Sequence, residues 1–449
     1  MSPTQQAAEQ AARASYGRLL AWLARRSRDL AAAEDALSEA FRAALETWPA
    51  RGIPTSPEAW LLTAARRNLG HAQRHQGVRA AAAAAMAWLA EEAEDAPADI
   101  PDQRLGLLFA CADPGIAEAD RAPLMLQAVL GLDAARIAGA FLASPAAMAQ
   151  RLVRAKSRLR EAGLRFEIPG RDAMPARLQA VLEAIYAAYG SGWEDIAGAD
   201  PRRRGLAEEA LFLARLLAAL LPEEPEALGL SALLCHCEAR RPARRGPGGG
   251  FIPLAEQEVA LWERALQAEA EAALHAAFAL HRPGRFQLEA AIQSAHASRA
   301  VLGSTPWAGI RRLYDALAQL APTAGALVGQ AAATAEAEGA AAGLALLEAL
   351  PPALAAAYQP YHALRAHLLA RLGQDASASF RQAIGLAEDP AVRAFLTARM
   401  GEAGASADAQ ASASADGPAG ASADGQAGAS ADGQAGASAD GQAGARAEG

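Results

Sequence analysis

Amide and basic side chains close to residue 150 are of the types that contact a nucleic acid. Ser144 and Pro145 are typical of an N-cap and a first helical position, so they predict a helix that begins here. One face of this helix is apolar and would hold Met148, Leu152, Val153 and Leu159. The opposite face carries Gln150, Arg151, Arg154, Lys156 and Arg158. Because arginine and lysine bind phosphates and glutamine can pair with a base edge, this second face could contact DNA.

A shorter predicted helix precedes this one and is joined to it by a tight turn. Asp133 can cap the shorter helix, and residues 142–144 would form the turn. A second helix presented in this way can enter the major groove of DNA. Ala146, Ala147 and Gln150 would then lie at base edges, and the arginines farther along would lie at phosphates. The pattern equally allows a plain helical hairpin with a solvated basic face.

Two predicted helices nearer the N-terminus combine acidic, aromatic and basic side chains. The first spans residues 29–48 and leaves Asp35 and Glu39 outside its apolar face. That apolar face would hold Leu30, Ala33, Leu37, Ala40, Phe41, Ala44, Leu45 and Trp48. The second helix starts at Ser56 and Pro57. Its aromatic and basic side chains include Trp60, Arg66, Arg67 and Arg74. On composition alone this is an ordinary amphipathic pair.

The side chains that could bind a metal do not have the spacing of a metal site. Cys235, His236 and Cys237 are consecutive, and neighbouring helix positions point about 100° apart, so they cannot converge on one ion. We therefore expect buried or half-buried helix residues there, and Cys111 in the core. No metal and no cofactor are expected. The usual glycine, serine and histidine motifs of nucleotide-binding and hydrolytic enzymes do not occur, so we do not expect an enzyme.

Composition favours an all-α protein that can bind a polyanion locally. The chain has 449 residues, is rich in alanine, the strongest helix former, and has only 5% aromatic residues. The net charge is −8, but residues 13–79 hold 11 arginines against 6 acidic residues. Residues 104–165 hold 9 basic against 5 acidic residues, and residues 80–103 hold 6 acidic residues and no basic one. Local charge decides contact with DNA, so the acidic total does not exclude it.

Neither a signal peptide nor a transmembrane segment is visible, and the cysteines form no disulfide framework. A cytoplasmic protein without membrane contact is therefore expected. Prolines, glycines and composition divide the chain into segments 10–79, 80–103 (an acidic linker), 104–168, 171–403 (helical) and 404–449 (a tail of ASADGQAG octads). Residues 240–250 are expected to be irregular. Among the helices expected in 171–403 are those at residues 206–221, 256–280, 286–296 and 340–349. Residues 361–390 are similar to one tetratricopeptide (TPR) repeat, so 171–403 could be a helical-repeat array.

The helical blocks resemble an extracytoplasmic-function (ECF) sigma factor of the sigma-70 family. DLAAAEDALSEAF and SPEAWLLTAARRN, within residues 29–68, are similar to region 2 of these proteins. Residues 131–169 are similar to region 4, and their MAQRLVRAK run is typical of a subgroup with a long C-terminal extension. Residues 213–234 and 283–297 are similar to that extension. The resemblance covers residues 13–403 and departs from the family motif at His71 and Ala72.

The resemblance implies a fold and a set of contacts. It implies a sigma region 2 helical bundle at 10–79, a region 4 helix-turn-helix domain at 104–168 and a TPR-like extension at 171–403. Asp35 and Glu39 would face core RNA polymerase. The −10 promoter element would be contacted by Trp60, Arg66, Arg67 and Arg74. Residues 145–158 would contact the −35 element, and a regulatory protein or ligand could act on the extension.

The expected function is therefore to direct core RNA polymerase to specific promoters for transcription initiation. Two alternatives remain open from the sequence. One is a helix-turn-helix DNA-binding regulator without sigma activity. The other is an interaction scaffold in which the helical repeats are the working part.

Overall fold

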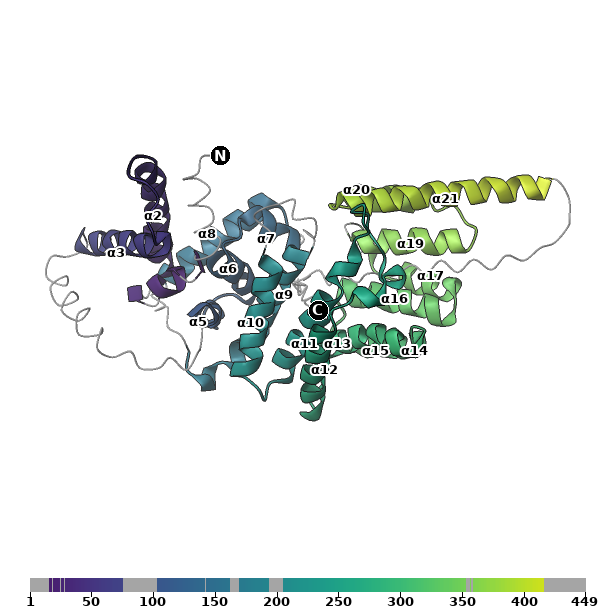
Figure 1. The fold of residues 1–449 in the computed structure, drawn as a ribbon, viewed down its shortest axis with the longest axis horizontal. Coiled ribbons are helices and arrows are strands. Elements are labelled where there is room, and N and C mark those ends of the chain that lie inside the picture. The colour runs from purple at the N-terminus through teal and green to yellow at the C-terminus, as the bar shows by residue number, and fades with distance from the viewer. Residues whose placement is uncertain are drawn as a thin grey trace, which may run out of the picture. The chain divides into compact units, whose positions relative to one another are not determined.

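The fold was analysed in a computed structural model, and it is all-α in the part of the chain that the structure describes. The described residues are 16–17, 19–24, 26–27, 29–75, 103–141, 143–161, 169–193, 205–352, 356 and 358–415. Within these ranges the regular structure is α-helix with short 3-10 turns and no β-strand (Figure 1). One isolated antiparallel bridge joins Arg245 and Phe251. The all-α prediction is confirmed.

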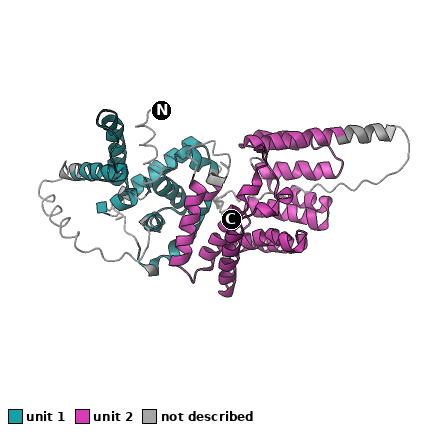
Figure 2. Ribbon diagram, viewed as in Figure 1, with its two compact units in different colours: residues 1–188, 441–449 teal, residues 189–440 magenta. Residues whose placement is uncertain are grey.

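The chain divides into two compact units that separate between Ala188 and Tyr189 (Figure 2). The division falls inside a helix, later than the expected boundary at residues 169–170. The named helices of the first unit are α2 (Leu30–Arg51), α3 (Pro57–His75), α5 (Gln103–Cys111), α6 (Glu118–Leu130), α7 (Ala134–Ala140), α8 (Pro145–Glu161) and most of α9 (Pro175–Trp193). Residues 16–27 are also helical at their described positions.

Helices α2 and α3 pack on each other, and the sequence specifies where α2 begins and ends. The Asp29 side chain caps α2 by accepting from the backbone N–H of Ala32 at 3.0 Å. After α2, Gly52 adopts a positive φ of 84°, which glycine tolerates without strain. Ala33, Leu37, Ala40, Ala44 and Trp48 form the buried stripe of α2. This stripe holds α3 in place and orients the opposite side of α2 toward solvent.

The second unit is built around α11 and continues as a series of helices in which each packs on the next. Its helices are α10 (Leu206–Leu220), α11 (Pro225–Ala239), α12 (Arg264–Ala279), α13 (Arg285–Ala297), α14 (Arg299–Leu302), α15 (Trp307–Leu320), α16 (Ala324–Glu338), α17 (Ala340–Glu348), α19 (Gln359–Arg371), α20 (Ser377–Leu386) and α21 (Pro390–Ala415). Figure 1 shows α15 to α21 lying side by side. Helix α21 extends past residue 404, where the octad tail was expected to start.

A partly buried carboxylate joins α11 to the start of α13. Glu226 accepts from the backbone N–H of Phe286 at 2.9 Å and of Gln287 at 3.1 Å. These are among the first N–H groups of α13, which have no partner within the helix. A Cβ placed on Gly284 would lie 2.2 Å from the Glu226 carboxyl carbon, so only glycine leaves room for this contact. The PGRF run at residues 283–286 thus has a structural explanation.

The irregular segment after α11 connects distant parts of the second unit. Arg245 pairs with Asp389, and Arg399 donates to Glu256 at 2.9 Å. Phe251 meets Phe395 edge-on, with ring centroids 5.4 Å apart. The expected irregularity of residues 240–250 needs one correction, because Arg241–Arg244 form a turn of 3-10 helix. Burial of Trp262 beneath Arg299, 4.9 Å from its ring, interrupts the helix expected from residue 256, and α12 begins only at Arg264.

The stability of the second unit should decrease in acid because two histidines are buried. Burial, together with Arg240 and Arg299, lowers the pKa of His296 from 6.5 to about 3. Burial lowers the pKa of His236 to about 4, although Glu271 opposes the shift. The unfolded chain therefore binds protons that the folded chain does not. The free energy of unfolding is therefore highest above pH 6.5 and decreases as the pH falls toward about 4. Each histidine contributes a decrease of up to ~1.4 kcal/mol per pH unit.

The measurement is urea unfolding of the full chain across this pH range, with His296→Gln as the variant. We expect a shallower pH dependence for the variant than for the parent. An identical slope would show that His296 does not contribute to the acid sensitivity.

Candidate nucleic-acid interface

The structure contains the two N-caps, one for α7 and one for α8, that the sequence predicted. The Asp133 side chain accepts from the backbone N–H of Arg136 at 3.0 Å and starts α7. Ser144 Oγ accepts from the backbone N–H of Ala147 at 3.3 Å and starts α8. Met148 and Leu152 are buried, as is Ala155. Leu142, in the expected turn, and the side chain of Leu159 lie outside the described residues.

The outward face of α8 presents the side chains expected at base edges. Ala146, Ala147, Gln150 and Arg154 are all exposed. Val153 is also exposed, at 65%, which contradicts its expected place in the apolar face. The reason is geometric, because Leu152 points into the core and the next residue is rotated by about 100°. We call Ala146, Ala147, Gln150, Val153 and Arg154 the outer face of α8.

Three predicted basic side chains of α8 contact carboxylates of the protein itself. Arg151 Nε donates to Asp120 Oδ1 at 2.7 Å, and its guanidinium also donates to the Ala119 carbonyl. Lys156 Nζ lies 2.5 Å from Glu34 Oε2. Arg158 remains 67% exposed, with one nitrogen 3.9 Å from Asp120. Of the basic residues predicted to contact DNA, Arg154 and Arg158 are therefore accessible to solvent. Arg151 and Lys156 instead form ion pairs within the protein.

The residues of α3 that were predicted to contact DNA differ in their exposure to solvent. Trp60 is half-buried and meets the buried Trp48 edge-on, with ring centroids 5.6 Å apart. Arg66 is half-buried and lies over the Trp22 ring at 5.1 Å. Arg67 is exposed. Arg74 belongs to α3, but its side chain lies outside the described residues, as do those of His71 and Ala72.

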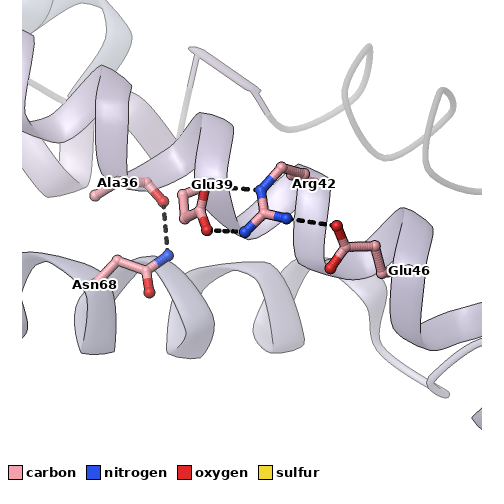
Figure 3. Close-up of polar contacts among 5 residues, drawn as sticks. All are labelled: Ala36, Glu39, Arg42, Glu46 and Asn68. Atoms are coloured by element: carbon pink, nitrogen blue, oxygen red, sulfur yellow. Dashed lines mark hydrogen bonds and ion pairs between the residues drawn. The ribbon is translucent and has the colours of Figure 1, made fainter.

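The exposed side of α2 is acidic and carries an ordered charge network. Asp35 and Glu39 are both exposed. Figure 3 shows Arg42 between Glu39 and Glu46, with Arg42 Nε donating to Glu39 Oε2 at 2.9 Å. The hydrogen bond from Arg42 lowers the pKa of Glu39, so this carboxylate stays ionised. We call Asp35, Glu39, Arg42 and Glu46 the acidic stripe of α2.

Two features of this surface were missed by the sequence analysis. Leu45 was expected in the core but is 46% exposed beside the acidic stripe. The alternation of Glu39, Arg42 and Glu46 at spacings of three and four is a signal for ion pairs on a helix, and it could have been used. The exposed side of α2 is therefore a mixed acidic and apolar surface.

The cysteines and histidines of α11 do not form a site of their own. Cys235 and His236 are buried and Cys237 is partly buried, as expected for helix residues, and Cys111 is confirmed in the core. Among the residues that the structure describes, no group of three or more potential ligands could hold a metal ion. In the same part of the chain, no helix has the length and apolar character needed to cross a membrane.

Comparison with known families decides what these helices are. The model of sigma-70 region 2 matches residues 12–78, which include α2, α3 and the helical residues 16–27. Residues 12–78 are thus similar to sigma-70 region 2, which supports a sigma-70 family member. The acidic stripe and α3 both lie within the matched residues. A family of unknown function, DUF6596, matches residues 177–278, which extend from α9 to α12.

One relative is similar to this chain over most of the length of both proteins. The Uncharacterized protein R00370 of Rhizobium meliloti (strain 1021) is 36% identical over 385 residues. The match covers 83% of this chain and 90% of that protein, so the two belong to one family. No solved structure has a significant match to the chain. The region 2 match suggests sigma-factor-like promoter recognition, with core RNA polymerase and promoter DNA as the partners that it implies.

Proposed function

We propose that the protein is an ECF-type sigma factor that directs core RNA polymerase to specific promoters. The observation that carries the proposal is the region 2 match at residues 12–78, on helices whose exposed side is the acidic stripe of α2. A fixed negative surface complements the positive surfaces of polymerase subunits that bind nucleic acid. Asp35 and Glu39 would bind the polymerase, with Leu45 supplying apolar contact at the edge.

In this proposal α3 contacts the −10 element. The exposed Arg67 would bind a backbone phosphate, and Arg74 would do so about two turns later. Trp60 and Arg66 would support α3 through their contacts with Trp48 and Trp22. Their aromatic and basic surfaces also suit an opened strand, which binds by stacking and phosphate contact.

Helices α7 and α8 would form the helix-turn-helix of region 4 and contact the −35 element. Capped ends and a buried stripe fix α8, so its outer face is presented as one rigid surface. Ala146, Ala147 and Gln150 would lie at base edges, and Arg154 and Arg158 at phosphates. Arg151 and Lys156 would position α8 through Asp120 and Glu34 rather than bind DNA.

The second unit would act as the regulator of this sigma factor. Its consecutive helix pairs, from α15 to α21, support a TPR-like array, and such arrays bind partners along an extended surface. A regulatory protein or a ligand would act there in place of a separate inhibitor protein.

The proposal is tested by binding of the full chain to core RNA polymerase. Reversing charge in the acidic stripe, with Asp35→Arg and Glu39→Arg together, should weaken binding at least ten-fold. Glu258→Arg is the matched control, because it reverses an exposed acidic residue of the second unit. Absence of polymerase binding by the parent chain, with duplex binding retained, would favour a DNA-binding regulator without sigma activity.

The paired role of Lys156 gives a separate prediction. Lys156→Met should lower the free energy of unfolding by about 1–3 kcal/mol, because it leaves a carboxylate at 12% exposure without its cation. The other oxygen of Glu34 is buried and has no partner among the described residues, so nothing replaces the lysine. Adding Glu34→Gln should recover much of the loss in urea unfolding. A Lys156→Met variant that folds as stably as the parent but loses DNA affinity would instead place Lys156 at the DNA.

A further inference from the structure

An apolar side chain lies at one edge of the outer face of α8. Val153 is 65% exposed, whereas the apolar residues that anchor this helix are buried. A β-branched residue has no propensity advantage on a solvated helix surface. On the helix surface Val153 is rotated by about 60° from Gln150, three residues before it, and by about 100° from Arg154, directly after it. Val153 is thus the largest apolar side chain among the groups that would meet DNA.

The major groove offers one apolar group for such a side chain. Each thymine presents a C5-methyl group there, and aliphatic side chains pack on it. The Gln150 amide can pair with both N6 and N7 of adenine. Three helical residues advance about 4.5 Å along the axis, and stacked base pairs are about 3.4 Å apart. Val153 would therefore meet the base pair next to the one that Gln150 contacts.

We propose that Val153 is a specificity-determining residue that packs on a thymine methyl group of the −35 element, one base pair from an adenine contacted by Gln150. The inference rests on the proposed function, because it requires α8 to enter the major groove. The proposal requires the −35 element to contain two adjacent A·T base pairs. Arg154 would fix the register of the helix through a phosphate and would not distinguish bases.

The test uses duplexes selected from a randomised library by the full chain bound to core RNA polymerase. In the selected sequence each thymine is replaced in turn by deoxyuridine, which removes only the C5-methyl group. We expect one position at which the parent protein loses about three- to five-fold in affinity, as for one buried methyl group. This thymine should lie next to an adenine in either strand. At that position Val153→Ala should bind the thymine and uracil duplexes equally.

Val301→Ala is the matched control, because it makes the same change at a valine that is 89% exposed in the second unit. This control should retain the parent's preference for thymine. The inference is overturned if no single deoxyuridine reduces binding by the parent, or if Val153→Ala keeps the full preference. Failure to select any duplex would instead overturn the proposed function, so the two failures are distinguishable.

Discussion

Replacing Arg154 and Arg158 together with alanine should weaken duplex binding about ten- to a hundred-fold at low salt. Both side chains are accessible in α8, unlike Arg151 and Lys156, which are paired with Asp120 and Glu34. Each arginine at a phosphate forms a charge-assisted hydrogen bond and releases counterions. The loss should be similar for all duplex sequences. The slope of log affinity against log salt should become shallower by about two.

The control for this experiment is Arg312→Ala, which removes an exposed arginine from α15 in the second unit. Fluorescence anisotropy with promoter and scrambled duplexes, over a series of salt concentrations, measures both quantities. Loss of discrimination between the two duplexes, with an unchanged salt slope, would place these arginines at base edges. Unchanged binding would show that α8 does not meet DNA through this face.

Replacing Gly229 with alanine should destabilise the second unit by about 1–3 kcal/mol or more. An added Cβ would lie 2.6 Å from the backbone nitrogen of Gln287 and 3.0 Å from its Cα. The neighbour is backbone at the start of α13, so it cannot move away without also disturbing the hydrogen bonds that Glu226 accepts there. Helices α11 and α13 would have to separate.

Gly385→Ala is the matched control for this variant. Gly385 also lies in a helix, α20, but an added Cβ there would meet nothing within 4 Å. Alanine should therefore raise stability by about 0.4–1 kcal/mol through the lower entropy of the unfolded chain. Hydrogen exchange of peptides from α11 and α13, measured on the full chain, should show faster exchange in Gly229→Ala only. Equal protection in both variants would contradict the close crossing of α11 and α13.

Helix positions in this protein follow closely from its sequence. The caps at Asp133 and Ser144 were predicted and are present, as are the helices that begin near residues 206, 286 and 340. Local rules suffice there, because a cap or a proline acts within one turn. Helix α12 was harder to predict, since Trp262 is buried by a contact with Arg299, which is distant in sequence.

The orientation of individual site residues was less predictable. Val153 and Leu45 were both assigned to apolar faces and are exposed, because an error of one position rotates a side chain by about 100°. The pairing of Lys156 with Glu34 joins residues 122 positions apart, and no local pattern signals it. A basic helix face can therefore be predicted from sequence, whereas which of its cations remain available for DNA depends on the tertiary fold.

The central claim is that this chain makes core RNA polymerase start at particular promoters. The most direct test mixes the full chain and its 1–188 fragment separately with core RNA polymerase and genomic DNA fragments, and sequences the transcripts. We expect discrete start sites that share elements near −10 and −35, with the −35 element containing adjacent A·T pairs. Transcripts from the fragment alone would identify the second unit as an inhibitor. Random start sites identical to those of core polymerase without either protein would contradict the account.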